Sequence, residues 1–479
     1  MMPFVRRFLG PLAALLFLAG ITIAQRPTPT PSYSIPFVVP GQQGQRNPID
    51  FYDFSWQEFF ALNWPVKVAY GQPPQRGVPD TDKKIGDLGV PRVWETWKAD
   101  FELFPAQPGY PPKFVAPTDW SSWDVAVPVC PAPEGSKMLP LVAKGESVLP
   151  GGVNQAMGGP VVDQHKQYVR YEVRLNQTEY DETKDKLWFL RDHLSKDPKK
   201  PNLFTASIPG KYGAIELKAA WRVMTKEEAE ANPPRFYTSQ AYVVDPKTHK
   251  CSAQPVTVGL IGFHIAHKTD TFHAWVWSTF EHVDNVPAPG VPVPPGGYSL
   301  YDGTSTNVSL KFWGFSPALA YKPLDVSQLP NPPTQVTNVL RLTPIQSEIQ
   351  DLNNKVHQLP GIRGTVWEKY ELVEAQWQTK FPQPIAISNP KTGEDLYSQL
   401  AGFPTDAVAN TSMESFFQGF KGNPADPAKN RIGIPTFGTS CLHCHYQAAQ
   451  FDFSWVLADA AWPSAPGSTF KRKGAAPHK

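Results

Sequence analysis

Proline is the residue that most constrains the fold of this chain. It occupies 53 of the 479 positions, about 11% and roughly twice the average usage. Because proline lacks a backbone N–H and breaks helix interiors, much of the chain must run as loops, turns and extended segments. The 15 tryptophans and a hydrophobic content of 41% are nevertheless enough for a sizeable core.

The charges of the chain are balanced. There are 45 lysines and arginines against 43 aspartates and glutamates, which gives a formal net charge of +2. Broad nucleic-acid binding usually needs a strongly basic surface, so we expect no nucleic-acid partner. The same balance gives no support for docking to an acidic membrane surface.

The N-terminus has the pattern of an export signal. Arg6 and Arg7 precede an apolar stretch, 10–24, that ends in a small residue, Ala24. That stretch is shorter than the roughly 20 residues that a membrane-spanning helix needs, although a retained anchor is the alternative. We therefore predict that residues 1–24 are a cleaved signal peptide and that the mature protein is periplasmic or secreted, with no membrane association beyond the signal.

Apolar and β-branched runs predict a β-rich middle of the chain. Such runs are separated by turn residues, and the last two should form a hairpin around Lys-Thr-Asp-Thr. The four runs are 213–224, 235–245, 255–268 and 273–283, and further strands are expected at 168–173 and 365–377. Helices are expected from a capping box at Ser55 and at 93–104, 179–196, 344–359 and 411–420.

These patterns predict an α+β fold. Residues 25–49, rich in Pro, Gln, Gly and Ser, should form a flexible leader. Residues 50–335 should form a β-rich antiparallel domain with peripheral helices and long proline-rich loops. A C-terminal region, 336–479, should follow it.

The motif that points to chemistry is Cys-Leu-His-Cys-His at positions 441–445. It matches the Cys-x-x-Cys-His attachment sequence of c-type haem. Two thiols three positions apart on one helical turn can reach both vinyl groups at one edge of a porphyrin, and the next residue then places its imidazole under the iron. We predict one covalent haem c on Cys441 and Cys444, with His445 as an axial ligand. Region 336–479 would then be the haem-binding region.

Other uses of the two cysteines fit the sequence less well. A thioredoxin-like pair should follow an early strand and open a helix in a βαβ unit, whereas this pair lies near the C-terminus. A zinc site would normally need a second pair of ligands, and a disulfide between Cys441 and Cys444 would be sterically tight. Export favours haem, because cytochrome c maturation occurs outside the cytoplasm.

On these residues the chain resembles c-type cytochromes. It is similar to uncharacterised bacterial proteins of the cytochrome c family that combine a long β-rich N-terminal region, segments like TFEHVDN (here 279–285) and VWEKYELV (here 366–373), and one C-terminal haem motif. The resemblance implies haem binding and electron transfer with redox partner proteins, and it names no substrate. Small soluble cytochromes carry the motif early, with a methionine ligand downstream. Here no methionine follows His445, so their fold does not carry over in its usual order.

The second axial ligand of the iron separates the possible functions. Met413 is the methionine nearest to the motif, His264 is another option, and an open or water-bound iron is the third. A ligated iron suits an electron carrier. An open iron would suit a periplasmic haem oxidoreductase of the peroxidase type or a haem-based sensor, so whether the chain is an enzyme is left open. Aromatic residues near the motif should wall the haem or pack as an ordinary core: Phe437, Tyr446, Phe451, Phe453 and Trp455.

The remaining cysteines and the hairpin histidines also allow expectations. In an exported protein Cys130 and Cys251 should form a disulfide, with two buried thiols as the alternative. Four histidines, at 264, 267, 273 and 282, suggest a metal site. Alternation along a strand, however, puts His264 and His267 on opposite faces, which favours satisfied or partly buried side chains.

Overall fold

The computed structural model describes the chain in several stretches. These are residues 28–41, 46–104, 116–125, 130–140, 160–190, 193–194, 202–246, 248, 250–270, 272, 275–288, 290–293, 297–303, 332–334, 336–339, 341, 344–378, 410–415, 441, 445, 448 and 451–460. The predicted signal peptide, Cys444 and His273 lie outside them.

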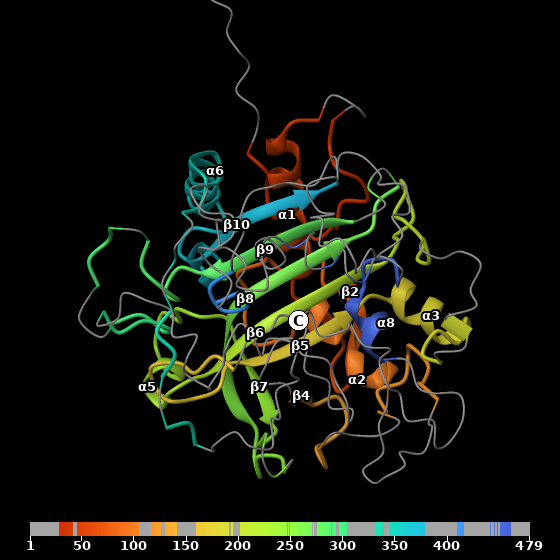
Figure 1. Cartoon of the computed structure of the whole chain (residues 1–479), viewed down its shortest axis with the longest axis horizontal. Helices are drawn as coiled ribbons and strands as arrows, with labels where there is room; N and C mark the ends of the chain where they lie inside the picture. The colour runs from red at the N-terminus through yellow and green to blue at the C-terminus, as the bar shows by residue number, and fades with distance from the viewer. Residues whose placement is uncertain are drawn as a thin grey trace, which may run out of the picture.

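A single large sheet organises the described residues (Figure 1). Its main path is β10-β9-β8-β6-β5-β3, with every neighbouring pair antiparallel, and β7 pairs with β8 and, in parallel, with β4. The strands are β3 (Lys98–Ala99), β4 (Lys137–Leu139), β5 (Arg170–Leu175), β6 (Ile215–Val223), β7 (Thr238–Val243), β8 (Val256–His267), β9 (Val276–His282) and β10 (Tyr370–Trp377). A separate two-stranded sheet pairs β1 (Val66–Val68) with β2 (Pro74–Pro79).

Short helices surround this sheet. They are α1 (Pro48–Leu62), η1 (Trp94–Thr96), α2 (Asp100–Leu103), α3 (Gln177–Asp185), α5 (Lys226–Ala229), α6 (Ser347–His357), η4 (Val366–Lys369) and α8 (Trp455–Ala460). The predicted α+β fold with a β-rich core is confirmed at this level. Among the described helices, none is long and apolar enough to cross a membrane.

The predicted β-rich runs are all strands, β6 to β9, and the β8–β9 hairpin is confirmed. Its register pairs His267 with Val276 and Gly262 with Glu281. A turn around Lys-Thr-Asp-Thr would place Lys268 opposite residue 273, so the observed register differs from this expectation by two residues. Because side chains alternate with a period of two, a shift of two residues leaves every side chain on its predicted face.

Two predicted helices are wrong in extent. Residues 93–104 form η1, then β3, then the single turn α2, because β3 pairs with β5 and Arg174 donates a hydrogen bond to the carbonyl of Trp97. These tertiary contacts outweigh the helical spacing of the apolar residues. Helix α1 begins at Pro48, seven residues before Ser55, because Asn47 and Asp50 form the capping box there. The Ser55 hydroxyl contacts the Phe51 carbonyl and Ser278 instead.

Other helix predictions have mixed outcomes. The helix predicted at 344–359 is confirmed as α6, and the one predicted at 179–196 is confirmed in part as α3, which ends at Asp185. Residues 410–415 form turns rather than the start of the helix predicted at 411–420, whose remainder lies outside the described residues.

Two hydrophobic clusters cover opposite faces of the sheet near its centre. The α1-side core includes Trp56, Phe59, Phe263 and Phe280, with the Phe59 and Phe280 rings 4.5 Å apart between centroids. The C-terminal cluster includes Trp188, Trp275, Trp277, Phe451, Phe453, Val456 and Leu457, together with residues of α2 and α3. In Figure 1, α8 accordingly lies beside α2 and α3 at one end of the sheet.

Segments at both ends of the predicted β-rich domain join this body. In the predicted flexible leader, Val39 is 1% exposed and the Phe37 ring stacks on Tyr212 at 4.4 Å. Strand β10 pairs with β9, so the sheet continues across position 335. The division of the chain at that position remains a prediction.

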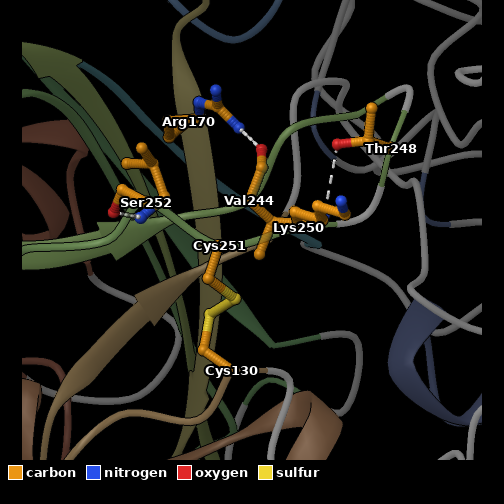
Figure 2. The surroundings of a disulfide bond; sticks show 8 residues. Cys130, Arg170, Val244, Thr248, Lys250, Cys251 and Ser252 are labelled. Carbon is orange, nitrogen blue, oxygen red and sulfur yellow. Dashed lines mark hydrogen bonds between the residues drawn. A yellow bond between two sulfur atoms is a disulfide. The ribbon is translucent and has the colours of Figure 1, made fainter.

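The predicted disulfide between Cys130 and Cys251 is confirmed (Figure 2). It links the segment before β4 to the residues after β7, where Val244 and Cys251 form an isolated bridge and the Val244 carbonyl accepts a hydrogen bond from Arg170. The bond closes a sequence separation of 121 residues. In the chain-entropy model such a loop contributes on the order of 4–5 kcal/mol.

Candidate haem-attachment site

The described part of the motif has the backbone that haem attachment needs. Cys441 and His445 each have helical backbone geometry, and residues 442–444 between them lie outside the described part of the chain. Cys441 packs partly buried against the C-terminal cluster. Cys444 lies outside the described residues, so its role remains a prediction.

The His445 ring has a defined protonation pattern. Its Nδ1 lies 2.7 Å from the carbonyl oxygen of Phe453. A carbonyl only accepts hydrogen bonds, so Nδ1 carries a proton, and in the neutral ring the lone pair is on Nε2. Ligating histidines are usually held in this way by a carbonyl or carboxylate, which fixes both tautomer and ring orientation.

One aromatic ring packs against this imidazole, and further buried aromatic residues lie close to it in the sequence. The Trp277 ring lies 3.9 Å from the His445 ring between centroids. The predicted wall residues Phe451, Phe453 and Trp455 are 8%, 4% and 6% exposed. Trp275 and Trp277 were missed from the sequence, since they lie some 170 residues before the motif and only the sheet brings them to it. Phe437 and Tyr446 lie outside the described residues.

The loop that presents the Phe453 carbonyl has an unusual backbone. Asp452 and Phe453 have φ values of 58° and 64°, which non-glycine residues seldom adopt. The Asp452 carboxylate is fixed by Lys268 Nζ, by the backbone N–H of Phe204 at 2.7 Å and by the indole of Trp275 at 3.3 Å. These contacts hold the loop in the conformation that directs the carbonyl at His445.

Buried carboxyl groups lie beneath this loop, and no sequence pattern predicts them. Ser454 Oγ donates a 2.8 Å hydrogen bond to Glu216. Burial raises the pKa of Glu216 to about 7. Burial, reinforced by the nearby Glu216, also raises the pKa of Glu179 well above its ordinary value. Burial raises the pKa of Asp452 and lowers that of Lys268, because desolvation opposes both charged forms.

The two residues predicted as possible distal ligands lie in different places. Met413 is 4% exposed and packs in a third cluster with Tyr171, Met224 and Ile261. His264 lies on β8, with its side chain 15% exposed and its Nε2 3.4 Å from Glu414 Oε2. Ligation by either remains a prediction.

His267 belongs to the other face of the sheet, as predicted. Its Nε2 lies 2.6 Å from Ser207 Oγ, and its Nδ1 contacts Glu58 of α1. A serine beside one ring nitrogen of a histidine and a carboxylate beside the other is also the arrangement of a nucleophilic triad. All three residues are 0% exposed. The group therefore links α1, β8 and the loop at Ser207 and is not accessible to a substrate. Burial lowers the pKa of His282, the third described histidine of this set, to about 4.

A cavity of about 1080 Å³ lies elsewhere, beside β2, β4 and β7. Lys137 in its lining is paired with buried carboxylates, 2.9 Å from Glu95 and 2.7 Å from Glu172. None of the described residues between 441 and 460 is among its lining residues.

Comparison with protein-family models, with curated proteins and with solved structures found no match. The functional argument therefore rests on the five-residue motif and on the geometry around His445.

Proposed function

We propose that this chain is an exported monohaem c-type cytochrome that transfers electrons through one haem bound covalently to Cys441 and Cys444. The observation that best supports the proposal is the 2.7 Å contact between His445 Nδ1 and the Phe453 carbonyl. It leaves on Nε2 the lone pair that an axial ligand needs. Redox partner proteins would supply and accept the electrons.

The residues present fit the cofactor. A porphyrin is a large apolar body, and the C-terminal cluster provides buried aromatic side chains beside Cys441 and His445. Bound haem would supply a one-electron couple between ferric and ferrous iron. Axial ligand, hydrogen bonding to that ligand and burial are the means by which a protein sets the potential of the couple.

The chain's own residues would orient the ligand and cover part of it. The Phe453 carbonyl holds the His445 ring, and its hydrogen bond increases the basicity of the ligand. Asp452 and Lys268 hold the loop behind it. The buried rings of Trp277 and Phe453 cover part of the imidazole, which is itself partly exposed.

The alternative function is a haem oxidoreductase or sensor, which requires an accessible open position on the iron. The length of chain before the motif motivates it, yet no observation among the described residues favours it, and the cavity beside β4 is lined by other segments.

The test is covalent attachment after export. The protein is produced with the cytochrome c maturation machinery, and the periplasmic fraction is stained for haem on a denaturing gel. We expect a stained band whose N-terminus follows Ala24. Replacing Cys441 and Cys444 together by alanine should abolish the stain. The matched control removes the other two cysteines, Cys130→Ala with Cys251→Ala, and should keep it. A wild-type band without stain would refute the proposed function.

A further inference from the structure

The sheet face that holds Trp277 also holds His264. In the β8–β9 ladder Trp277 lies opposite Ala266, and Thr279 lies opposite His264. Directly opposed residues of an antiparallel pair share a face, and every second residue along a strand shares it too. His264 is therefore the diagonal neighbour of Trp277, with Cα atoms roughly 7–8 Å apart.

This places His264 nearer than Met413 to the attachment site. His445 lies against Trp277, at the level of Ala266. His264 is two residues further along β8, about 7 Å at the usual rise per residue. Met413 lies against Gly262, where its Cε would be 3.2 Å from an added Cβ. Gly262 is four residues from Ala266, about 13 Å.

The two histidines share a second feature. Metal-ligating histidines normally donate the N–H of the non-ligating ring nitrogen to a carbonyl or carboxylate. His445 makes this contact with the Phe453 carbonyl at 2.7 Å, and the carboxylate of Glu414 lies 3.4 Å from His264 Nε2, at ion-pair distance rather than in a hydrogen bond. His264 would then ligate through Nδ1, which is a normal donor for neutral imidazole. Its side chain is only 15% exposed, so the residue is built into the sheet face rather than placed at the surface.

We propose that His264 is the second protein ligand of the iron, on the opposite side of the haem from His445, with Glu414 as the carboxylate that positions it. The inference rests on the proposed function and deepens it. Ligation by two histidines closes both axial positions, which suits an electron carrier rather than an enzyme or sensor with an open iron.

The test uses the mature, haem-loaded protein and reads coordination by electron paramagnetic resonance, by absorption, and by carbon monoxide titration of the reduced form. Wild-type protein should show a low-spin ferric signal and bind little carbon monoxide. His264→Ala should convert the signal to high spin and bind carbon monoxide in a one-to-one ratio. Added imidazole should restore the low-spin signal in that variant.

Two further variants keep the proposal open to refutation if His264→Ala folds poorly. Met413→Leu keeps the volume of that side chain and should leave the spectrum unchanged. Glu414→Gln should stay low-spin and shift the midpoint potential upward, because a less basic imidazole stabilises ferric iron less. A wild-type protein that binds carbon monoxide in a one-to-one ratio would overturn the proposal. So would a low-spin signal that survives in His264→Ala or disappears in Met413→Leu.

The haem stain shows whether a failed prediction concerns the proposed function or only the assignment of His264 as a ligand. If wild-type protein carries no covalent haem, the proposed function fails and the assignment of His264 fails with it. If the stained band is present and the His264 and Met413 variants behave otherwise than expected, only the ligand assignment fails.

Discussion

The two faces of the central sheet are built on different principles. On the α1 side, interlocked rings fill the core and polar groups pair across it, as Trp56 does with Asn353 and Ser55 with Ser278, while among the described residues Glu58 Oε2 has no hydrogen-bond partner. On the C-terminal side, Asp452 and Phe453 have positive φ. There, among the described residues, neither carboxylate oxygen of Glu179 has a hydrogen-bond partner. Backbone strain is often retained at functional sites, and we refer to the C-terminal side, which carries His445, as the working face of the proposed cytochrome.

The largest expected effect tests the α1-side core. Phe59→Ala should lower the free energy of unfolding by about 3–5 kcal/mol, because a fully buried ring leaves a cavity that the surrounding side chains cannot fill. The loss should be the same with and without haem, since Phe59 lies on the opposite face from His445. Denaturant unfolding of both forms measures it. Tyr70→Ala, at a fully exposed position, should leave stability unchanged. A loss confined to the haem-loaded form would contradict the division between the faces.

The next effect tests the ion pair on the working face. Lys268→Met leaves the buried Asp452 carboxylate without its cation, and breaking a buried pair costs about 3–5 kcal/mol. We expect a loss near the lower end, about 3 kcal/mol, because burial already raises the pKa of Asp452 and favours its neutral form.

Unlike the change at Phe59, this one should also disturb the His445 ring, because Asp452 fixes the loop that presents the Phe453 carbonyl. Adding Asp452→Asn to Lys268→Met should recover part of the stability, which a double-mutant cycle measures. Additive losses would show that the two side chains do not act as a pair.

The third effect concerns the disulfide, which lies away from both clusters. Reduction, or Cys130→Ser with Cys251→Ser, should destabilise the protein by about 2–4 kcal/mol. It should leave the haem spectrum unchanged, because no contact in the described residues joins Cys130 or Cys251 to His445. Thermal unfolding with and without reductant, followed by absorption of the haem, measures both quantities. A spectral change on reduction would show coupling between the bridge and the site.

The sequence predicts the local features of this molecule better than the distant ones. The β8–β9 hairpin follows from two apolar runs and a turn, and the haem-attachment motif is recognised from the five residues 441–445 alone. The contacts that complete the working face are not local: Lys268 meets Asp452 across 184 positions and Ser454 meets Glu216 across 238. Nothing near Lys268 in the sequence indicates a buried partner, because the pairing exists only once the C-terminal segment folds onto the sheet.

The predicted helix over 93–104 shows the opposite failure. Its local spacing of apolar residues is helical, but β3 must pair with β5, and Arg174 bonds the Trp97 carbonyl. The helical spacing of the apolar residues is outweighed by strand pairing at the edge of the sheet, which the local sequence does not indicate. The α1 side was easier to predict because its residues form long amphipathic or alternating runs, whereas the working face is assembled from short pieces.

The smallest expected effect is a pH dependence that belongs to the working face. Glu216 has a raised pKa of about 7, caused first by burial and also by Asp100, and opposed by Ser454 and Lys218. Between the ordinary value of 4.5 and about 7, the folded protein holds a proton on Glu216 that the unfolded chain has released. The free energy of unfolding therefore falls as pH rises through that window. The contribution is on the order of 1–3 kcal/mol, from about 1.4 kcal/mol per unit of pKa difference.

Glu216→Gln should flatten the stability profile between about pH 4.5 and 7 while leaving stability below that window nearly unchanged, because glutamine imitates the protonated acid. Glu227→Gln, at an exposed position on α5, is the matched control and should keep the wild-type slope. Denaturant unfolding at several pH values measures both variants. Parallel profiles for wild type and Glu216→Gln would show that the carboxyl group is hydrated in solution. The working face would then be less closed to water than the packing of Ser454 and Trp277 indicates.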